Sequence, residues 1–533
     1  MEIEFVGGAR TVTGSSYILK DKDFQIMIDC GMFQGRSQIR ERNLIQLIYA
    51  PAQINTLLLT HAHIDHSGLI PKLVKEGFTG KIFATRATSD LCTVMLPDSA
   101  HIQEMEMEWV NRKNKRLGLP IQDPIYTVED AENSVKNFIP VEYGNKVRIN
   151  SRIEARYRDA GHILGSSMIE LWVDGENGKT KIVFSGDLGK KDQAFIRNPD
   201  IIEDADILLI ESTYGNRLHK QKEDTLEEFK NIILNSYNKK GNIIIPAFAI
   251  ERTQEIIIEL SKLFKEKLIP EIPVYVDSPL AIRATEIFRR NVDYCDEETK
   301  KIIMSGGNPL YFPNLFFTRT AEESRKLNDE VSGAIIISAS GMCTAGRIKY
   351  HLLHNLYKTE SCVIFVGFQA EGTIGRRLVD GAKRIKLFGE DVIVNAKIHT
   401  LGGFSAHADR DGLLEWMGNI KNKKLKVFIV HGEEEAAQSF AQTVRSKFGY
   451  DTYVPNWGEI VDLSTMRSRI ASYGITETYT TVDHEIEALT EALKSLSEQY
   501  KHARDEKRIK DMKKLQSDLN DAREMLALIS YEL

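Results

Sequence analysis

The six residues HAHIDH (61–66) decide the fold, because they place three histidines and an aspartate directly after an apolar run, INTLLLT. That run predicts a short buried strand, and the following SGLIPKLVKEG predicts a helix. Imidazole nitrogens and carboxylate oxygens are ligands that zinc accepts. On an extended segment His61 and His63 point to the same side, whereas Asp65 and His66 begin the turn and can reach a second point. The stretch therefore predicts a metal centre with two adjacent positions.

Two residues further along the chain can complete such a centre. His162 lies in DAGHILGS and Asp187 lies in FSGDLG, and each follows an apolar strand and has a glycine beside it. The glycines allow the backbone to approach closely. A carboxylate can bridge two metals and a neutral imidazole cannot, so Asp187 is the candidate bridge.

The composition sets limits on the class of protein. The chain has 533 residues, 42% of them hydrophobic and 27% charged, as in a soluble globular protein of several domains. Its net charge of −6 means that nucleic acid binding would need a local basic groove or a bound metal. The five cysteines are scattered and form no C-x-x-C pair, which excludes a disulfide framework and a thiolate zinc site and favours the cytoplasm. We expect neither a signal peptide nor a membrane span.

The chain reads as one domain interrupted by another. Strands dominate residues 1–213, with a hairpin expected at 20–23 and a helix at about 88–115. Four strand–helix units in series within 214–395 predict a parallel sheet. The strand-rich pattern returns at 396–465.

Residues 466–533 differ from the rest, because apolar residues there recur at spacings of three and four. This pattern predicts two amphipathic helices in an antiparallel hairpin. The hairpin could pack on its own chain or form a dimer contact, and the sequence does not decide between them. The stretch Met105–Trp109 is interpreted as a helix packing surface and not as a platform for stacking bases.

Further motifs carry a resemblance to a known family. HAHIDHSG with the later Gly-His and Gly-Asp resembles the metallo-β-lactamase superfamily. Glu211-Ser-Thr-Tyr-Gly, Ser405-Ala-His407-Ala-Asp409 and Val430-His431-Gly432-Glu433 resemble motifs A, B and C of its β-CASP group, which are nucleases with an inserted domain. Over residues 1–465 the chain is similar to the RNA-processing branch related to the cleavage-and-polyadenylation endonuclease. The implied fold is α/β: an αββα sandwich interrupted by a β-CASP domain with a parallel sheet, followed by the helical hairpin.

The resemblance also implies roles for individual residues. One zinc would be held by His61, His63 and His162, and a second by Asp65, His66 and His431, with Asp187 shared. Asp29 would support the ligand histidines without binding metal. The catalytic residues would be Asp65 and His407, the general acid, with Glu211 holding His407 in place.

The function implied is a ribonuclease with two Zn²⁺ per chain. The metals would activate a water for in-line attack on single-stranded RNA, leaving a 5′-phosphate and a 3′-hydroxyl, in RNA processing or decay. The histidine of motif C favours RNA over DNA. The chain is expected to be a cytoplasmic homodimer without membrane contact. Endonuclease and 5′→3′ exonuclease action both stay open.

A phosphate contact is predicted inside the insertion. Ser338, Ser340 and Gly341 end a strand, and Arg347 lies in the first turn of the next helix, where anions are favoured. A plain structural turn is the alternative reading. The spacing from Gly341 to Gly346 resembles a P-loop, but Arg347-Ile348 replaces the Lys-Ser/Thr pair, so nucleotide hydrolysis is rejected.

Two other functions compete with the ribonuclease. The first is a small-molecule metallohydrolase of the lactonase or thioesterase type, which the inserted domain and His407 argue against. The second is a non-catalytic RNA-binding scaffold, which the intact set of ligands argues against.

Overall fold

The computed structural model describes residues 1–45, 47–175, 178–220 and 222–470, together with single positions between 493 and 523. The chain forms two compact units, 1–470 and 471–533. The predicted helical hairpin lies outside the described residues, except for positions 466–470 and those single positions. Of these, Ser468–Ile470 is strand β23, so the first unit reaches past residue 465. No helix of the described part has the length and apolar character that crossing a membrane requires.

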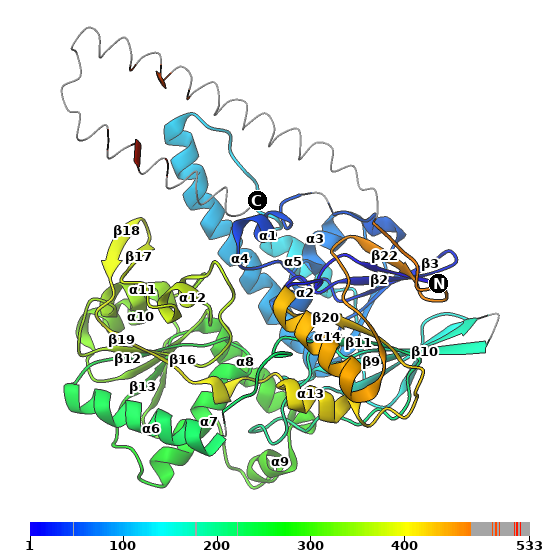
Figure 1. The fold of residues 1–533 in the computed structure, drawn as a ribbon. Coiled ribbons are helices and arrows are strands. Elements are labelled where there is room, and N and C mark those ends of the chain that lie inside the picture. Colours follow the sequence, from blue (N-terminus) through cyan, green and yellow to red (C-terminus); the bar gives the residue numbers. More distant parts are fainter. Residues whose placement is uncertain are drawn as a thin grey trace. The chain divides into compact units, whose positions relative to one another are not determined.

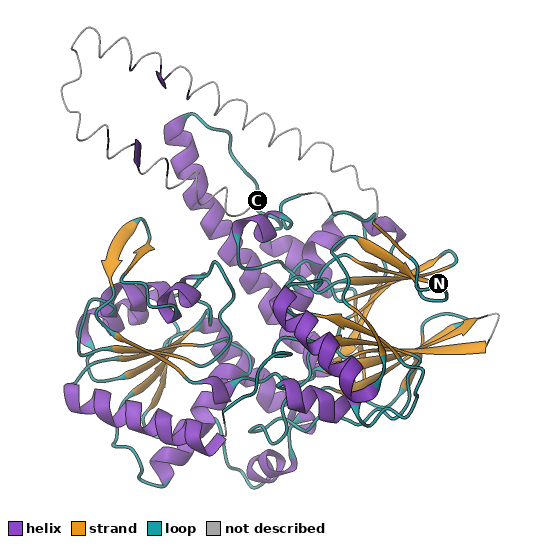
Figure 2. Ribbon diagram, in the orientation of Figure 1, coloured by secondary structure: helices purple, strands orange, loops and turns teal. Residues whose placement is uncertain are grey.

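Two mixed sheets form the centre of the interrupted domain (Figures 1 and 2). The first has eight strands in the order β23-β22-β1-β2-β3-β4-β5-β6 and the second has seven in the order β21-β20-β11-β10-β9-β8-β7. The first comprises β1 (Glu2–Phe5), β2 (Tyr17–Asp21), β3 (Phe24–Ile28), β4 (Thr56–Leu58), β5 (Lys81–Thr85), β6 (Phe138–Val141), β22 (Glu459–Asp462) and β23. The second comprises β7 (Lys146–Arg148), β8 (Ile153–Asp159), β9 (Ser167–Gly175), β10 (Gly178–Phe184), β11 (Ile207–Glu211), β20 (Lys426–Val430) and β21 (Asp451–Tyr453). The predicted hairpin at 20–23 is confirmed, since β2 and β3 pair antiparallel with Asp21 opposite Phe24.

Alternating side chains divide each sheet between two cores. Leu58 and Phe428 face a core shared by both sheets, whereas Leu57 faces the helices outside the first sheet. Leu208 and Ile429 likewise face the helices outside the second sheet. The outer helices are α3 (Ile70–Lys75), α4 (Arg86–Leu117) and α5 (Val128–Val135) on the first sheet, and α13 (Arg410–Met417) and α14 (Glu434–Phe448) on the second. This period of two buries both faces of each sheet and gives the expected four-layer αββα sandwich.

The inserted domain is built on a six-stranded sheet whose neighbouring strands are all parallel, as predicted. Its order is β14-β13-β15-β12-β16-β19, with β12 (Ile243–Pro246), β13 (Val274–Val276), β14 (Leu315–Phe317), β15 (Ile335–Ser338), β16 (Cys362–Phe365) and β19 (Lys397–Thr400). The strand β19 extends this sheet beyond the expected boundary at 395, because it pairs with the edge of β16. The helices of this part are α6 (Lys222–Lys239), α7 (Arg252–Lys265), α8 (Pro279–Arg290), α9 (Glu297–Met304), α10 (Ala321–Glu330), α11 (Ile348–Asn355) and α12 (Ile374–Val379).

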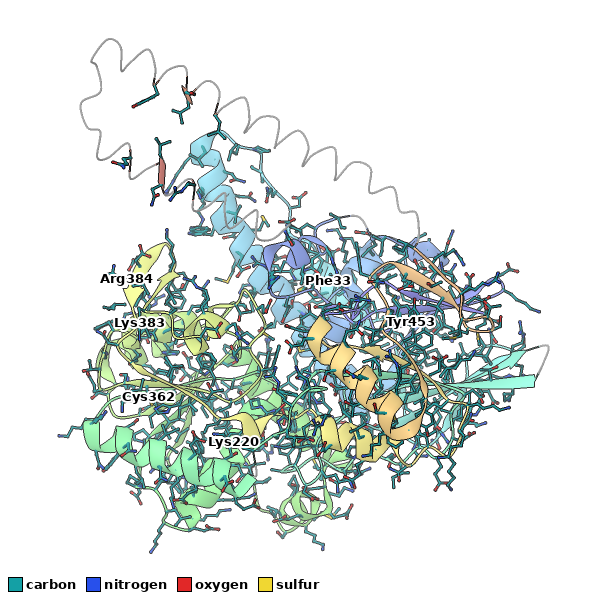
Figure 3. The ribbon with its side chains drawn as sticks, viewed as in Figure 1. Phe33, Lys220, Cys362, Lys383, Arg384 and Tyr453 are labelled. Atoms are coloured by element: carbon teal, nitrogen blue, oxygen red, sulfur yellow. The ribbon has the colours of Figure 1, made fainter. Side chains whose placement is uncertain are left out.

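Smaller elements complete the fold. A two-stranded hairpin, β17 (Arg384–Leu387) and β18 (Glu390–Ile393), projects from the inserted domain, and Figure 3 shows Lys383 and Arg384 at its start. Short helices are α1 (Ser37–Glu41) and α2 (Ile64–Ser67), and 3-10 turns occupy Pro51–Gln53, Val292–Tyr294 and Gly402–Phe404.

Helix α4 is longer than the expected 88–115. It has 32 residues, the Thr85 hydroxyl accepts a hydrogen bond from the Thr88 N–H at its start, and Gly118 ends it in the left-handed conformation. Eight residues between Ala87 and Ala100 are buried, but no residue from 101 to 117 is. The interpretation of Met105–Trp109 as a packing surface is therefore wrong for the described part of the chain: Met105 is 57% exposed and Trp109 is 60% exposed.

Candidate metal centre and catalytic site

Six strands deliver the candidate residues to one place. Most of the residues lie at or within three residues of the C-terminal end of a strand, where α/β folds build their sites. Along the chain the residues are Asp29 after β3, His61 to His66 after β4, His162 after β8, Asp187 after β10, Glu211 at the end of β11 and His431 after β20. The parallel pairing of β11 with β20 places Glu211 opposite Val430, next to His431.

The first group of ligand atoms has the spacing of a tetrahedral site. His63 Nδ1 lies 3.1 Å from His61 Nε2 and 3.2 Å from His162 Nε2. Asp187 Oδ2 lies 3.5 Å from each of those two Nε2 atoms. Four ligands at the usual zinc distances stand about 3.3 Å apart, so these residues fit a zinc ion.

A second group stands on the other side of Asp187. His66 Nε2 lies 3.2 Å from both His431 Nε2 and Asp187 Oδ1. Asp65 Oδ2 lies 3.6 Å from His431 Nε2. The two carboxylate oxygens of Asp187 thus face different groups, and its buried Oδ1 accepts no hydrogen bond. A buried carboxylate oxygen without a donor is costly unless a cation meets it, which suits a bridging ligand.

Burial sets the charge of the first group. It lowers the pKa of His63 to about 4, and it holds the pKa values of His61 and His162 well below the ordinary value, with neighbouring histidines adding to the effect. These three rings are therefore neutral at pH 7 and offer the lone pairs that a metal needs. Burial opposes ionisation of Asp187, but His431 and His66 outweigh it and hold the pKa of Asp187 well below its ordinary value.

Asp29 and Thr60 orient the ligand rings. Asp29 Oδ2 lies 2.8 Å from His66 Nδ1, and its Oδ1 accepts a hydrogen bond of 2.7 Å from the Thr60 N–H. The Thr60 hydroxyl donates to Asp29 Oδ2 and lies 3.0 Å from His61 Nδ1. These contacts leave the Nε2 atoms of His61 and His66 facing the centre. Sequence reasoning missed Thr60; its place between a buried strand and the first ligand was the available signal.

Thr213 supports the last ligand in the same way. Its hydroxyl lies 3.2 Å from His431 Nδ1, so the opposite nitrogen of that ring faces the centre. Sequence reasoning also missed this residue, although it lies inside the quoted Glu211-Ser-Thr motif.

Backbone pairing holds His407 beside the centre. The N–H of Lys190 donates to Ala406 and that of Ala408 donates to Leu188, so His407 lies opposite Gly189. Gly189 permits this because an added Cβ would lie 1.6 Å from the Gly161 carbonyl oxygen. The segment after Asp187 is thus packed between the loops that carry His162 and His407.

The His407 ring contacts a buried carboxylate. Its Nδ1 lies 3.1 Å and 3.2 Å from the two oxygens of Glu211, which is fully buried and also accepts the Leu188 N–H at 2.7 Å. Burial lowers the pKa of His407, but Glu211 and Asp187 outweigh burial and raise it to about 9. An imidazolium at this position can donate a proton.

His219 was assigned no site role from sequence, yet it contacts this segment. Its Nε2 lies 2.9 Å from the carbonyl oxygen of His407, and its N–H donates to Asp409. Its ring also packs against that of Tyr214, at 4.6 Å between centroids. His219 therefore positions the backbone that carries His407.

Comparison with known proteins agrees with this geometry. Residues 9–84 match the metallo-beta-lactamase superfamily, 253–378 match the Beta-Casp domain, and 391–455 match the Zn-dependent metallo-hydrolase RNA specificity domain. A protein named ribonuclease TTHA0252, from Thermus thermophilus, is 34% identical over 459 residues, which cover 86% of this chain and 99% of the relative. The chain belongs to the β-CASP group of the metallo-β-lactamase superfamily.

Other β-CASP relatives have a different name. The protein from Methanocaldococcus jannaschii that is 30% identical over 465 residues is named transcription termination factor FttA. The match covers 85% of this chain and 70% of that relative. A protein of the same name from Methanosarcina mazei is 28% identical over 467 residues, covering 85% of this chain and 70% of the relative.

Within the β-CASP domain, three of the four predicted phosphate contacts have hydrogen-bond partners in their own chain. Arg347 Nη1 donates to the buried Asp277 at 2.6 Å, and Ser338 Oγ donates to the Asp277 carbonyl oxygen at 2.9 Å. Ser340 Oγ accepts the N–H groups of Thr344 and Ala345, which fixes the turn that follows β15. Both the Ser338 and the Arg347 contacts hold Asp277 in the fold.

Proposed function

We propose that this chain is a zinc-dependent ribonuclease that hydrolyses phosphodiester bonds of single-stranded RNA and leaves 5′-phosphate and 3′-hydroxyl ends. One observation carries the proposal: His407, held at 3.1 Å by the buried Glu211, lies 3.9 Å from the central carboxylate Asp187. A small-molecule metallohydrolase needs no such acid beside its metals. The relative named as a ribonuclease supports RNA as the substrate.

We propose two Zn²⁺ per chain, one for each group of ligand atoms. His61, His63 and His162 would hold the first, and Asp65, His66 and His431 the second, with Asp187 shared. Bound zinc would supply a water of lowered pKa and would neutralise the charge of the phosphate oxygens.

The chain's own residues complete the reaction. Glu211 fixes Nδ1 of His407, so Nε2 is the atom that faces the substrate. As water adds to phosphorus and the bond from phosphorus to the 3′ oxygen breaks, Nε2 gives its proton to that oxygen. One product then ends in a 3′-hydroxyl, and the other product begins with the 5′-phosphate. Asp65, proposed as both ligand and catalytic residue, approaches the same space from α2. Ser340 and Gly341 stay proposed phosphate contacts.

We also propose that the protein works as a homodimer in the cytoplasm. The five cysteines are all free thiols and all buried, which suits a reducing compartment.

The test combines metal analysis with RNA cleavage. Purified protein should contain two equivalents of zinc, and it should cut a 5′-labelled RNA bearing either a monophosphate or a triphosphate. A fixed fragment would indicate endonuclease action, whereas labelled mononucleotides from the monophosphate alone would indicate a 5′→3′ exonuclease. His407→Ala should keep its zinc and lose cleavage, and His399→Ala, in β19, is the matched control. RNA binding without cleavage by the wild-type protein would support a scaffold, and turnover of esters without RNA cleavage would support a lactonase.

A further inference from the structure

The second half of α4 is an exposed surface with large apolar side chains. Figure 1 shows this half extending away from the sheets. Trp109 and Leu117 are each 60% exposed and Met105 is 57% exposed, and the chain after the helix adds Leu119 at 52% and Ile121 at 71%. Apolar side chains gathered in this way on a projecting element mark an interaction surface.

One side of this helical segment already contacts its own chain. Asn111 exchanges two hydrogen bonds with the backbone of Gln122, at 2.8 Å and 2.9 Å, and Asn114 donates to the Pro120 carbonyl oxygen at 3.0 Å. The Val128 N–H donates to Glu104. The returning segment 119–128 thus covers the side of α4 that carries these residues.

The opposite side carries an ordered set of exposed residues, which we call the α4 outer face. Its members recur at spacings of three and four, as one helical stripe requires: Met105, Glu108, Trp109, Arg112, Lys113 and Arg116. The charges along the whole segment are segregated around Trp109. Acidic residues precede it at 104, 106 and 108, and basic residues follow it at 112, 113, 115 and 116.

A helix with one acidic and one basic half is complementary to itself when reversed. We propose that two copies of this chain pack antiparallel along the α4 outer face, around a two-fold axis that passes between Val110 and Asn111. This places Glu108 opposite the partner's Lys113 and Trp109 opposite the partner's Arg112. The same relation brings Met105 against the apolar stem of the partner's Arg116. Each contact occurs twice, as an isologous interface requires.

The order of charges favours a second copy over RNA as the occupant. A polyanion drawn to the basic half would meet the acidic half of the same helix, at residues 104, 106 and 108. A reversed copy instead satisfies both halves, and an arginine over an indole ring adds a cation–π contact. Trp109 is then covered near the two-fold axis, and Met105 is covered at each end of the interface.

The interface is small, since it uses one segment of α4 from each copy. Contacts below about 1,200 Å² belong to the weak and transient class, so we expect a dimer that dissociates on dilution. This inference rests on the proposed homodimer and not on the ribonuclease chemistry, because no residue of the α4 outer face belongs to the metal centre.

The test measures the mass of the full-length, zinc-loaded protein by sedimentation velocity over a range of concentrations. Glu108→Lys and Lys113→Glu each create two like-charge contacts across the interface, and each should raise the dimer dissociation constant at least about tenfold. Glu108→Lys also removes the 3.1 Å ion pair between Glu108 and Arg112 of the same helix, which Lys113→Glu leaves intact. The double variant should recover the wild-type constant, and an equimolar mixture of the two single variants should form heterodimers. Circular dichroism and the zinc content show whether each variant is folded.

Each remaining outcome would overturn the proposal. A wild-type protein that is monomeric throughout removes both the homodimer and its surface. A dimer that both single variants leave unchanged shows that the copies meet elsewhere. A change of RNA affinity in Glu108→Lys, without a change of mass, assigns the α4 outer face to RNA. None of these readouts depends on the protein being a ribonuclease.

Discussion

Asp159, at the end of β8, gives a prediction whose size can be worked out from the structure. Its side chain is 5% exposed and accepts one hydrogen bond of 2.9 Å, from the Gly161 N–H. Burial raises the pKa of this carboxyl from the ordinary 3.8 to about 7. At about 1.4 kcal/mol per pH unit, this difference corresponds to about 4 kcal/mol.

The folded protein holds the Asp159 proton more tightly than the unfolded chain does. Between pH 4 and pH 7 the unfolded chain has lost this proton and the folded protein still keeps it. The free energy of unfolding therefore falls as pH rises through this range, and the full cost of about 4 kcal/mol is present above pH 7. Asp159→Asn carries no charge and still offers an oxygen to Gly161. We expect it to equal the wild type near pH 4 and to be more stable by up to about 4 kcal/mol at pH 8.

The assay is urea unfolding of both proteins, with equal zinc content, at pH values from 4 to 8.5. Asp462→Asn is the control of opposite sign: hydrogen bonds from Ser464 and Thr465 lower the pKa of Asp462, so this variant should lose stability at neutral pH and match the wild type in acid. A difference between Asp159→Asn and the wild type that stays constant with pH would refute the argument.

Two further predictions concern Gly189 and Arg347. Gly189→Ala should lose zinc and cleavage, because its Cβ would lie 1.6 Å from the Gly161 carbonyl oxygen. The control is Gly118→Ala, in open space at φ +69°, which should lower the free energy of unfolding by about 1 kcal/mol and keep activity. Normal zinc content in Gly189→Ala would contradict this prediction. Arg347→Met should lower the free energy of unfolding by about 3 kcal/mol, because the buried Asp277 loses a charged partner, and should leave the KM for RNA unchanged. A raised KM at unchanged stability would restore Arg347 as a phosphate contact.

The resemblance to the metallo-β-lactamase superfamily implied the four layers, and the apolar run INTLLLT by itself predicted only a buried strand. The alternation of Leu57 and Leu58 between two cores is the pattern that predicts a strand with both faces covered. The pairing of β19 could not be predicted, for a different reason. Whether Lys397–Thr400 joins β16 or another edge depends on tertiary pairing, which local sequence does not contain.

The candidate centre was predictable where residue type alone restricts the chemistry. Histidines and aspartates at strand ends point to a metal, and the structure gathers all seven proposed ligands. Thr60, Thr213 and His219 could not be found in this way, because a hydroxyl or a distant ring becomes relevant only when its partner atom is known. The ion-pair partner of Arg347 could not be predicted either, because Asp277 lies 70 residues earlier in the chain. The exposure of Trp109 depended on how far α4 projects.

The order in which the ribosome makes this chain has a consequence for the cell. His407 and His431 are synthesised only after the whole inserted domain. The segment that contains Gly189 can form its backbone pairing only once Ala408 has been made. A nascent or truncated chain that ends before residue 407 carries six of the seven proposed ligands but no acid. Cleavage is therefore expected only after the chain has been made at least as far as His431, when the proposed acid and the last proposed ligand are both present.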